Sequence, residues 1–548
     1  MISPGQISFS VSRGSTRRLL QVAALASFIP GAALRAATLT VTSPADSGPG
    51  TLRDQIAASN PGDTIDFAIN GVITLNNAIS IGNPISVFGP GPSQLVISGN
   101  NVDRIFVITA SPVFLSGITV RDGRPVAPNG IDGGFGQNGT PGVDASGGAI
   151  YDTGASLTVS NCWFTRNQAI AGNGGRGGDN PVGAVFTPGQ GGKAGMAAAG
   201  AIYHSGTLTA IRCTFSENRA VGGNGGNGGD NLNAAVNQSG GKGGSGGQAW
   251  YGAVLSGTDG PYMTLCTFSG NLSAGGNGGT GGVTLAPFVG GTGGDGNGGN
   301  CGAYFVSAVS STLSCTIVSN VASGGKAGAG GTGTPTGPPG NVGIGSMGAL
   351  CGYAVVCQEK LVLGNTILAQ NFADVYSNAW VTFTDLGYNY VGDNYVTGCM
   401  GATGTHVGTV PSPLDPLLEP LAQNGSGLPT HKPTVNSPVL DAGSNFSLST
   451  DERGAPRPYD LLTYPNADDG SDIGAFEASN TELGLDVISN NVVLSWPAWA
   501  GDAALQSSTA LGPSSSWSTV SNAPVVVGAR FYVTNPIVSQ RFYRLIDR

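Results

Sequence analysis

Short alternations of apolar and polar residues, rather than long helical periods, mark the chain after residue 37. Examples lie at residues 157–159, 208–211 and 312–315. Side chains of a strand point alternately to its two faces, so runs of this length predict short β-strands with one buried face. Gly and Asn separate the runs, and we find no long segment with a helical period between them. The pattern therefore predicts an all-β chain.

The predicted strands belong to a repeat of about 50 residues, a period typical of solenoids, propellers and arrays. Five segments align without gaps, at residues 162–167, 213–218, 266–271, 315–320 and 366–371. If successive repeats stack as coils, equivalent residues form ladders with a spacing of about 4.8 Å. The expected apolar ladder is Phe164, Phe215, Phe268, Ile317 and Leu368. The expected amide ladder, at a turn, is Asn167, Asn218, Asn271, Asn320 and Asn371.

Three sets of motifs resemble a known family. They are residues 38–67 (TLTVT, then DSGPGTLRDQI and DTIDF), the GAIY and CTFSxN blocks of the coils, and residues 437–477 (SPVLDAG, DERG and DIGAFE). These residues resemble the right-handed parallel β-helix of the pectin-lyase-like superfold. More narrowly, they are similar to exported bacterial proteins with a choice-of-anchor Q type module and repeats like those of polymorphic outer-membrane proteins. The resemblance implies the fold and an extracellular or outer cell-surface location.

The expected organisation has five parts. They are an export signal (1–37), a capping helix with the first coils (38–125), coils with glycine-rich insertions (126–400), terminal coils with the choice-of-anchor motif (401–479) and a C-terminal β-sandwich module (480–548). The signal has a basic start, a short apolar stretch and small residues for cleavage; the alternative is a retained anchor. No other segment reaches about 18 uninterrupted apolar residues, so we expect no transmembrane span in the mature chain. The alternative for 480–548 is an extension packed on the last coil.

The insertions carry Gly at every third position, for example at Gly222, Gly225 and Gly228. Insertions at a fixed phase of a solenoid project from one face. A period of three matches a polyproline-II-type helix, and such helices pack closely where a row of Gly removes the Cβ atoms. One interpretation is therefore a bundle of stacked polyglycine-type arms. The other is a set of flexible loops, because fixing many Gly residues costs much backbone entropy.

Calcium is the cofactor that the insertions suggest, and we find no motif for another cofactor in the sequence. Residues 225–233 fit a nonapeptide of the calcium-binding β-roll type. The weak candidate ligands are Asp179, Asp230 and Asp295. Val283 stands at the position of Asp230 in the next repeat and cannot act as a ligand.

Cysteine and histidine placement leaves several options. Cys162, Cys213, Cys266 and Cys315 share one ladder position, either as reduced small apolar side chains or as disulfides between coils. Cys351 and Cys357 are the better disulfide candidates, with Cys301 and Cys399 as rivals. His204 stands where the previous repeat has Asp152, and we expect an exposed turn residue there.

Composition narrows the function. The 548 residues include 93 Gly, and only 10% are charged, with a net charge of −9. This balance argues against nucleic-acid binding, and 33 Pro residues are too few for collagen. We expect a non-catalytic, adhesin-like scaffold that binds glycan, matrix or another surface through its loop face. The alternative is a polysaccharide lyase or glycoside hydrolase, but carboxylates are scarce in the strands, and Asp451, Glu452, Asp472 and Glu477 are interpreted as capping the last coil.

Overall fold

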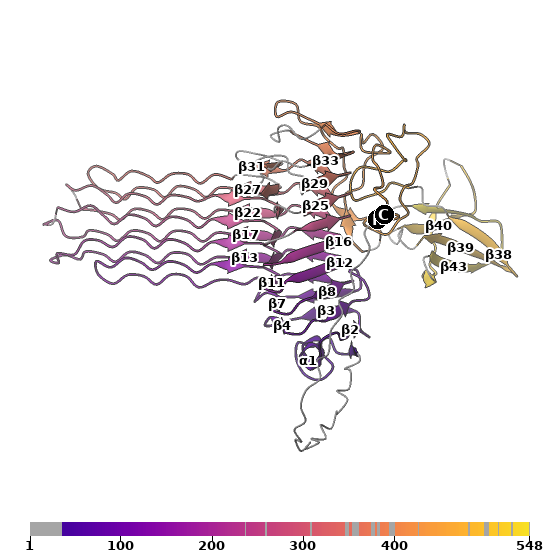
Figure 1. Cartoon of the computed structure of the whole chain (residues 1–548), viewed down its shortest axis with the longest axis horizontal. Helices are drawn as coiled ribbons and strands as arrows, with labels where there is room; N and C mark the ends of the chain where they lie inside the picture. Colours follow the sequence, from indigo (N-terminus) through magenta and orange to yellow (C-terminus); the bar gives the residue numbers. More distant parts are fainter. Residues whose placement is uncertain are drawn as a thin grey trace, which may run out of the picture. The chain divides into compact units, whose positions relative to one another are not determined.

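Parallel strands stack coil upon coil through most of the chain (Figure 1). The computed structural model describes residues 36–235, 237–257, 260–285, 287–306, 310–345, 350–352, 361–373, 379–380, 384–393, 401–425, 427–479, 483–497, 503–512, 515–527 and 530–546. Residues 37–548 form one unit. The expected export signal lies outside the described residues, apart from its last two positions.

A short helix covers the first coil. α1 (Leu52–Ala58) begins at Thr51, whose hydroxyl accepts a hydrogen bond from the Asp54 amide. The Asp54 carboxylate in turn accepts from the Gly50 amide at 2.8 Å. These two bonds satisfy backbone amides at the start of the helix that have no partner within it. Leu52 and Ile56 are buried in the core, which they close at this end of the stack.

Four sheets make up the coils. The largest contains β1 (Thr38–Val41), β2 (Thr64–Phe67), β3 (Gly71–Thr74), β5 (Ser86–Phe88), β6 (Leu95–Ser98), β8 (Val113–Ser116), β9 (Thr119–Arg121), β12 (Ser156–Thr165), β16 (Thr207–Ser216), β20 (Tyr262–Thr264), β21 (Thr267–Ser269), β25 (Ser310–Leu313), β26 (Thr316–Val318), β29 (Leu361–Gly364), β30 (Ile367–Ala369), β33 (Thr384–Gly387), β34 (Tyr390–Val391) and β35 (His406–Val407). The second contains β4 (Ile79–Ile81), β7 (Phe106–Ile108), β11 (Ile150–Asp152), β15 (Ile202–His204), β19 (Val254–Ser256), β24 (Tyr304–Val306), β28 (Leu350–Gly352) and β32 (Ala379–Trp380).

The two smaller sheets flank the glycine-rich insertions. One contains β13 (Gln168–Ile170), β17 (Arg219–Val221), β22 (Leu272–Ala274), β27 (Val321–Ser323) and β31 (Phe372–Ala373). The other contains β10 (Ala145–Ser146), β14 (Ala197–Ala198), β18 (Ala249–Trp250) and β23 (Gly299–Asn300). In all four sheets each strand pairs in parallel with the equivalent strand of a neighbouring coil. The prediction of an all-β parallel β-helix is therefore confirmed.

Equivalent side chains stack inside the coils. Phe164, Phe215 and Phe268 lie in register, with successive ring centroids 5.1 and 4.7 Å apart and rings tilted by 7°. Each stacked pair adds roughly 0.5–1.5 kcal/mol to the burial of apolar area. At the next turn Asn218 donates from Nδ2 to Asn271 Oδ1 at 2.9 Å and to the Phe164 carbonyl at 3.0 Å. The amide ladder thus satisfies buried backbone groups that no strand pairs.

The chain leaves the last coil near residue 408 and folds back along the largest sheet. This part contains the antiparallel pair β36 (Ala422–Gln423) and β37 (Pro429–Thr430). Residues 427–478, called the covering segment below, contact β16, β21 and β26 through hydrogen bonds. The described residues contain no helix long and apolar enough to cross a membrane.

Antiparallel strands form the C-terminal part. One sheet contains β38 (Gly484–Ile488), β39 (Asn491–Pro497), β43 (Arg530–Pro536) and β42 (Val525–Val527), and another contains β41 (Ser518–Thr519), β40 (Ala504–Ser508) and β44 (Phe542–Ile546). Leu494, Trp496, Leu505 and Val533 form a buried cluster between them. That these strands form a separate β-sandwich domain stays a prediction.

Candidate binding surface on the glycine-rich bundle

Each glycine-rich insertion is a pair of extended arms, one leaving the coil and one returning. The described residues contain five pairs, at 126–136 with 137–145, 171–180 with 188–196, 222–231 with 238–248, 275–284 with 289–298, and 324–334 with 335–345. The arms run side by side away from the coils (Figure 1). Together they are called the glycine-rich bundle.

Backbone hydrogen bonds join every arm to its neighbours in several directions. In one triplet, the Gly226 amide donates to the Gly192 carbonyl at 2.9 Å, and the Gly225 amide donates to the Asn277 carbonyl at 2.8 Å. The third amide, of Asn224, donates to Oδ1 of Asn173 at 2.8 Å. The pattern recurs at intervals of three residues, which is the period of a polyproline-II-type helix. Of the two interpretations that the sequence leaves open, the structure shows the stacked bundle.

The inner glycines are required by the spacing of the arms. A Cβ atom built on Gly226 would lie 1.9 Å from the Gly175 carbonyl oxygen, and one on Gly225 would lie 2.0 Å from that of Gly244. The first arm pair differs, because Ile131 and Val143 stand where the next pair has Gly175 and Gly195, and both are exposed. Their side chains end the stack, as terminal repeats of a solenoid commonly do.

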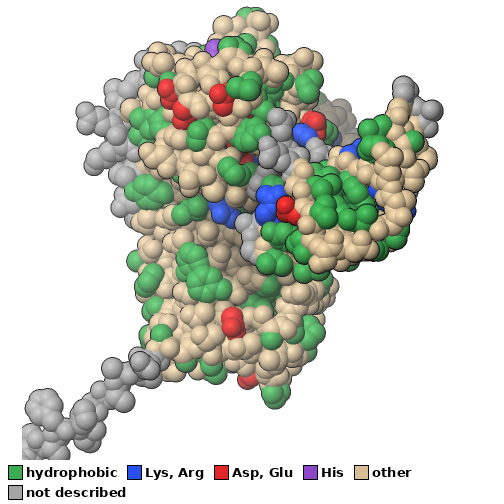
Figure 2. Space-filling view, turned by 90° about the vertical axis from the view of Figure 1, so that its right-hand side faces the viewer, with side chains coloured by type: hydrophobic (Ala, Val, Ile, Leu, Met, Phe, Trp, Pro, Cys, Tyr) green, Lys and Arg blue, Asp and Glu red, His purple; other side chains and the backbone are tan. Residues whose placement is uncertain are grey.

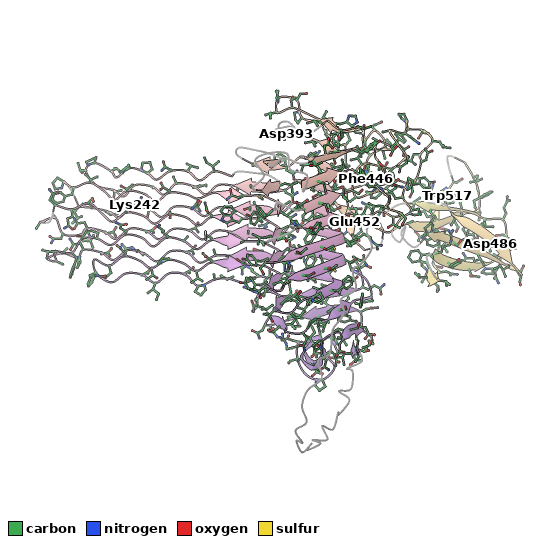
Figure 3. All side chains as sticks on the ribbon, viewed as in Figure 1. Lys242, Asp393, Phe446, Glu452, Asp486 and Trp517 are labelled. Atoms are coloured by element: carbon green, nitrogen blue, oxygen red, sulfur yellow. The ribbon has the colours of Figure 1, made fainter. Side chains whose placement is uncertain are left out.

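The outward residue of each triplet forms the two faces of the bundle. On one face the side chains are Asn129, Asn173, Asn224, Asn277 and Lys326 in one row and Asp132, Arg176, Asn227, Thr280 and Ala329 in the next. On the other they include Asn138, Gln190, Lys242 and Thr292, of which Figure 3 labels Lys242 on an arm. Asn and Asp oxygens accept from the outward amide of the following arm, as Asn138 does from Gln190 at 2.8 Å. The faces are therefore polar and ordered.

The aspartates suggested as calcium ligands already have partners. Arg176 contacts Asp179 at 2.5 Å and Asp230 at 2.8 Å. Although burial opposes it, the Arg176 guanidinium holds the pKa of Asp179 below its usual value. Asp295 Oδ1 accepts from the Asn341 amide at 2.7 Å. The described part of the chain contains no group of at least three His, Cys, Asp or Glu that could hold a metal ion. Calcium binding stays a prediction, which melting with and without excess chelator tests.

The turns between paired arms, called the tip, present apolar side chains. Asn180 Nδ2 donates to Asn231 Oδ1 at 2.9 Å, and a bridge joins Asn231 to Thr284, so this buried row holds successive turns together. Val182 and Val185 are each 80% exposed and Phe186 is 47% exposed. Leu232 and Leu285, in the turns of other arm pairs, are exposed as well, and so are Phe135, Val283 and Val289 at the ends of the arms next to the turns. Single exposed apolar residues are common, but several on neighbouring turns are typical of an interaction site.

The acidic residues Asp451, Glu452, Asp472 and Glu477 belong to the covering segment and are buried. Glu452, labelled in Figure 3, accepts from the Thr214 hydroxyl at 2.9 Å and from the Thr267 hydroxyl at 2.5 Å. His431 Nε2 lies 2.9 Å from the Ser269 hydroxyl of the same sheet. Burial raises the pKa of Glu452 well above its ordinary value. These contacts fasten the covering segment to the coils and leave none of the Glu452 carboxylate exposed.

Neighbouring carboxylates of the covering segment share one cation. Arg457 Nε lies 3.3 Å from Glu477 Oε2, and its Nη1 donates to the Gly474 carbonyl at 2.8 Å. Burial raises the pKa of Glu477 to about 8, that of Asp472 to about 7 and that of Asp441 to about 6. On the face shown in Figure 2, charged side chains are few and scattered. Asp441, Arg457, Asp472 and Glu477 are all buried, and their bonds to backbone groups hold turns of the covering segment together.

The expectation that His204 is an exposed turn residue was wrong. His204 is fully buried, and its Nδ1 lies 2.9 Å from Oδ2 of the equally buried Asp152. Strand alternation explains this, because Ile202 and His204 both point inward while Tyr203 points outward. Ser256 follows His204 in register, so Asp, His and Ser form one interior ladder without solvent access. The sequence signal was present, since the three residues occupy one column of the repeat alignment.

The four ladder cysteines are free and buried. Their thiols donate to carbonyls of their own coils, as Cys213 does to Ile211 at 3.4 Å. Cys301 is disulfide-bonded. Cys357, Cys399 and the side chain of Cys351 lie outside the described residues, so the proposed pairing of Cys351 with Cys357 stays a prediction.

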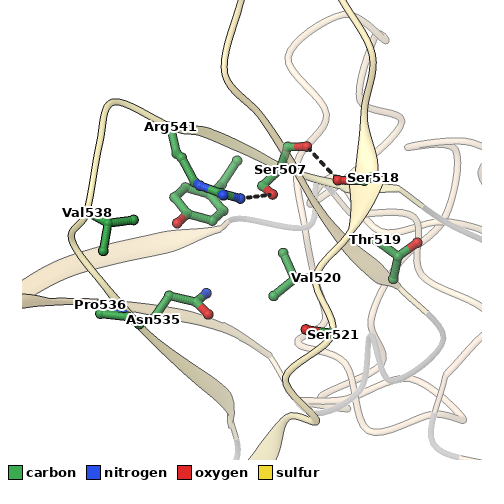
Figure 4. A pocket seen from close by; sticks show the side chains of 10 residues that line it. Ser507, Ser518, Thr519, Val520, Ser521, Asn535, Pro536, Val538 and Arg541 are labelled. Atoms are coloured by element: carbon green, nitrogen blue, oxygen red, sulfur yellow. Dashed lines mark hydrogen bonds between the residues drawn. The ribbon is translucent and has the colours of Figure 1, made fainter.

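A polar cleft lies among the C-terminal strands (Figure 4). It has a volume of about 330 Å³ and is lined by Ser507, Ser518, Thr519, Val520, Ser521, Asn535, Pro536, Val538, Arg541 and Tyr543. Arg541 Nη1 donates to the Ser507 hydroxyl at 3.2 Å, and the Ser518 hydroxyl donates to the Ser507 carbonyl at 3.5 Å. Nothing in the sequence pattern singled out this site, since its residues come from four separate strands and the loops beside them.

Comparisons with known proteins give little further identification. No family model matches the chain, and no curated protein matches it. One solved structure that it resembles is a springtail antifreeze protein from Granisotoma rainieri, described as a bundle of nine polyproline type II helices. The match has 26% identity and covers 39% of this chain and 92% of that chain, with a TM-score of 0.12. That TM-score is too low for the match to define the fold or the function of this chain.

Proposed function

We propose that the protein is a non-catalytic, adhesin-like scaffold of the cell surface or its surroundings, which binds glycan or matrix through the tip of the glycine-rich bundle. The observation that supports this most is the group of exposed apolar side chains, among them Val182, Val185 and Phe186, at the end of hydrogen-bonded arms. Such a group exposed to water is costly unless a partner covers it.

The order of the bundle favours this role. Binding costs less free energy when the contact residues are already held in place, because fewer conformations are lost. Asn180 and Asn231 fix the turns that carry the tip, and backbone bonds fix the arms behind them. A flexible loop of the same composition would lose much more entropy on binding.

The covering segment supports the finer assignment to the choice-of-anchor type. Asp441, Asp451 and Asp472, which belong to the motifs that carry the resemblance, are buried and accept backbone hydrogen bonds. A carbohydrate-active enzyme is the alternative class. It would need carboxylates that reach substrate, whereas Glu452 and Glu477 of the covering segment have no exposed surface.

Binding to a glycan array and to plates coated with matrix protein tests the proposal, with the chain from residue 38 to 548. The double variant Val182→Asp with Val185→Asp charges the tip, and Lys242→Gln on a face of the bundle is the matched control. We expect the parent chain to bind at least one probe. The tip variant should bind it at least about tenfold more weakly, and the control should bind it as the parent chain does. Binding that survives the tip variant, or release of new reducing or unsaturated sugar ends from any polysaccharide tested, would contradict the proposal.

A further inference from the structure

The C-terminal strands contain two clefts that share a wall. The polar cleft of Figure 4 and a second cleft of about 450 Å³ are both lined by Thr519, Val520 and Ser521. The second is also lined by Trp496 and by residues 503–505. Each volume lies in the range typical of small-molecule sites. The pair therefore offers room for a ligand longer than a single small group.

Each cleft has a buried donor that has no hydrogen-bond partner among the described residues. In the first, Asn535 Nδ2 has no hydrogen-bond partner, although its Oδ1 accepts from Asn522 Nδ2 at 2.9 Å. In the second, the indole Nε1 of Trp496 also has no partner. Leaving a buried donor unsatisfied costs about 1–3 kcal/mol, so most such groups in proteins bind something.

The charge of the first cleft favours an acidic ligand. Its lining includes Arg541 but no Asp or Glu. Arg541 bonds the uncharged Ser507 hydroxyl and forms no ion pair within the described residues. A guanidinium with free donors matches the two oxygens of a carboxylate.

The remaining lining suits a sugar. Ser518, Thr519 and Ser521 contribute hydroxyl groups to the first cleft, and Tyr543 contributes an aromatic side chain to its lining. A sugar ring has hydroxyls around its edge and apolar C–H groups on its face, so it can use both kinds of surface. We propose that the two clefts form one binding site for an acidic oligosaccharide, with Arg541 and Asn535 holding the carboxylate of one unit.

This site is separate from the tip, so the two proposals can fail independently. Arg544 provides a matched control three residues further along the chain, in β44, because its guanidinium lies over the Trp517 ring and bonds Gln506. Arg544 is not among the residues that line either cleft. The variants are Arg541→Gln and Arg544→Gln in the chain from residue 38 to 548. Near-ultraviolet circular dichroism checks that each variant keeps its C-terminal packing.

Titration calorimetry with hyaluronan and alginate tetrasaccharides, beside neutral chitotetraose, is the test. We expect an acidic tetrasaccharide to bind the parent chain, to lose at least about tenfold in affinity with Arg541→Gln and to keep its affinity with Arg544→Gln. Higher salt should weaken the binding of the acidic tetrasaccharide to the parent chain. The tip variant should leave this binding unchanged. Equal affinity for chitotetraose, an equal loss in both arginine variants, or no binding of either acidic probe would overturn the proposal.

Discussion

At the scale of single residues, the same residue type has different roles on different sides of the glycine-rich bundle. Gly226 lies between arms, where a Cβ atom would meet a carbonyl oxygen. Gly134 holds the same place within its triplet, one triplet further along the first arm pair, and a Cβ atom there would have nothing within 4 Å. The requirement for Gly therefore comes from the neighbouring arm and not from the triplet itself.

This contrast gives a paired prediction. Gly226→Ala should lower the free energy of unfolding by about 1–3 kcal/mol or more, because the arm has to shift to relieve the clash. Gly134→Ala should change it by less than about 0.5 kcal/mol or raise it slightly, since Ala restricts the unfolded chain. Urea melts of both variants measure the difference. Equal effects at the two positions would show that the arms are not packed as described.

The amide ladder gives a second prediction at this scale. Asn218→Asp keeps the shape of the side chain but removes the two donors that face Asn271 Oδ1 and the Phe164 carbonyl. The free energy of unfolding should fall by about 2–5 kcal/mol at neutral pH. The decrease should be smaller in acid, where the carboxyl group is protonated and can donate again.

Asn224→Asp is the control for the ladder variant. Asn224 is exposed, and its Oδ1 accepts from the Asn277 amide, a role that Asp retains. Thermal melts at two pH values should therefore show little change at position 224. A ladder variant as stable as this control would mean that the Asn218 donors contribute nothing.

At the scale of elements, the covering segment contains three carboxyl groups that should make its stability depend on pH. The pKa values of Asp441, Asp472 and Glu477 are raised by burial to about 6, 7 and 8. A group whose pKa is higher in the folded than in the unfolded chain stabilises the fold fully below its unfolded pKa. That contribution is lost as the pH rises through the folded value.

The free energy of unfolding should therefore fall between about pH 5 and pH 8.5. Urea melts across this range measure how the free energy of unfolding changes with pH. In the Glu477→Gln variant this change should be smaller at the alkaline end of the range. Hydrogen exchange of residues 437–477 should accelerate over the same range if the covering segment loosens first. A stability that rises steadily toward pH 8.5 would refute this assignment of the buried carboxyls.

The sequence predicted the coils well because ladder positions depend on local alternation and on the repeat. The stacking of Phe164, Phe215 and Phe268 could be predicted from the alignment alone. Residues at the same place in each repeat lie above one another in stacked coils. His204 was misplaced although the alternation of Ile202, Tyr203 and His204 points it inward. Contacts of Glu452 with Thr214 were beyond sequence reasoning, because nothing in the repeat shows where a later segment folds back.

The bundle was only half predictable from the sequence. The spacing of Gly indicated polyproline-II-type arms, but it could not decide between order and disorder. That choice depends on whether the bonds between arms, such as those of Gly225 and Gly226, outweigh the entropy of the free chain. The C-terminal clefts gave no sequence signal, since Asn535 and Arg541 resemble ordinary surface residues until the strands bring them together.

At the scale of the whole molecule, the coils act as a scaffold on which one long insertion per turn is repeated in register. The parallel pairing of coils, as in Cys162 with Cys213 and Phe164 with Phe215, sets the spacing at which the arms begin and end. The arms then bond at that same spacing, so the bundle continues the order of the coils outward. An apolar tip on such a support is the feature on which the proposed function depends.

The order of the bundle is the central claim, and amide hydrogen exchange measured by mass spectrometry tests it most directly. Peptides within residues 222–248 should exchange slowly. Gly225 and Gly226 amides, bonded to other arms, should be slower than the Asn224 amide, which is bonded to an exposed side chain. Rapid exchange throughout this stretch, at the rate of an unstructured chain, would contradict the bundle and the tip site that it supports.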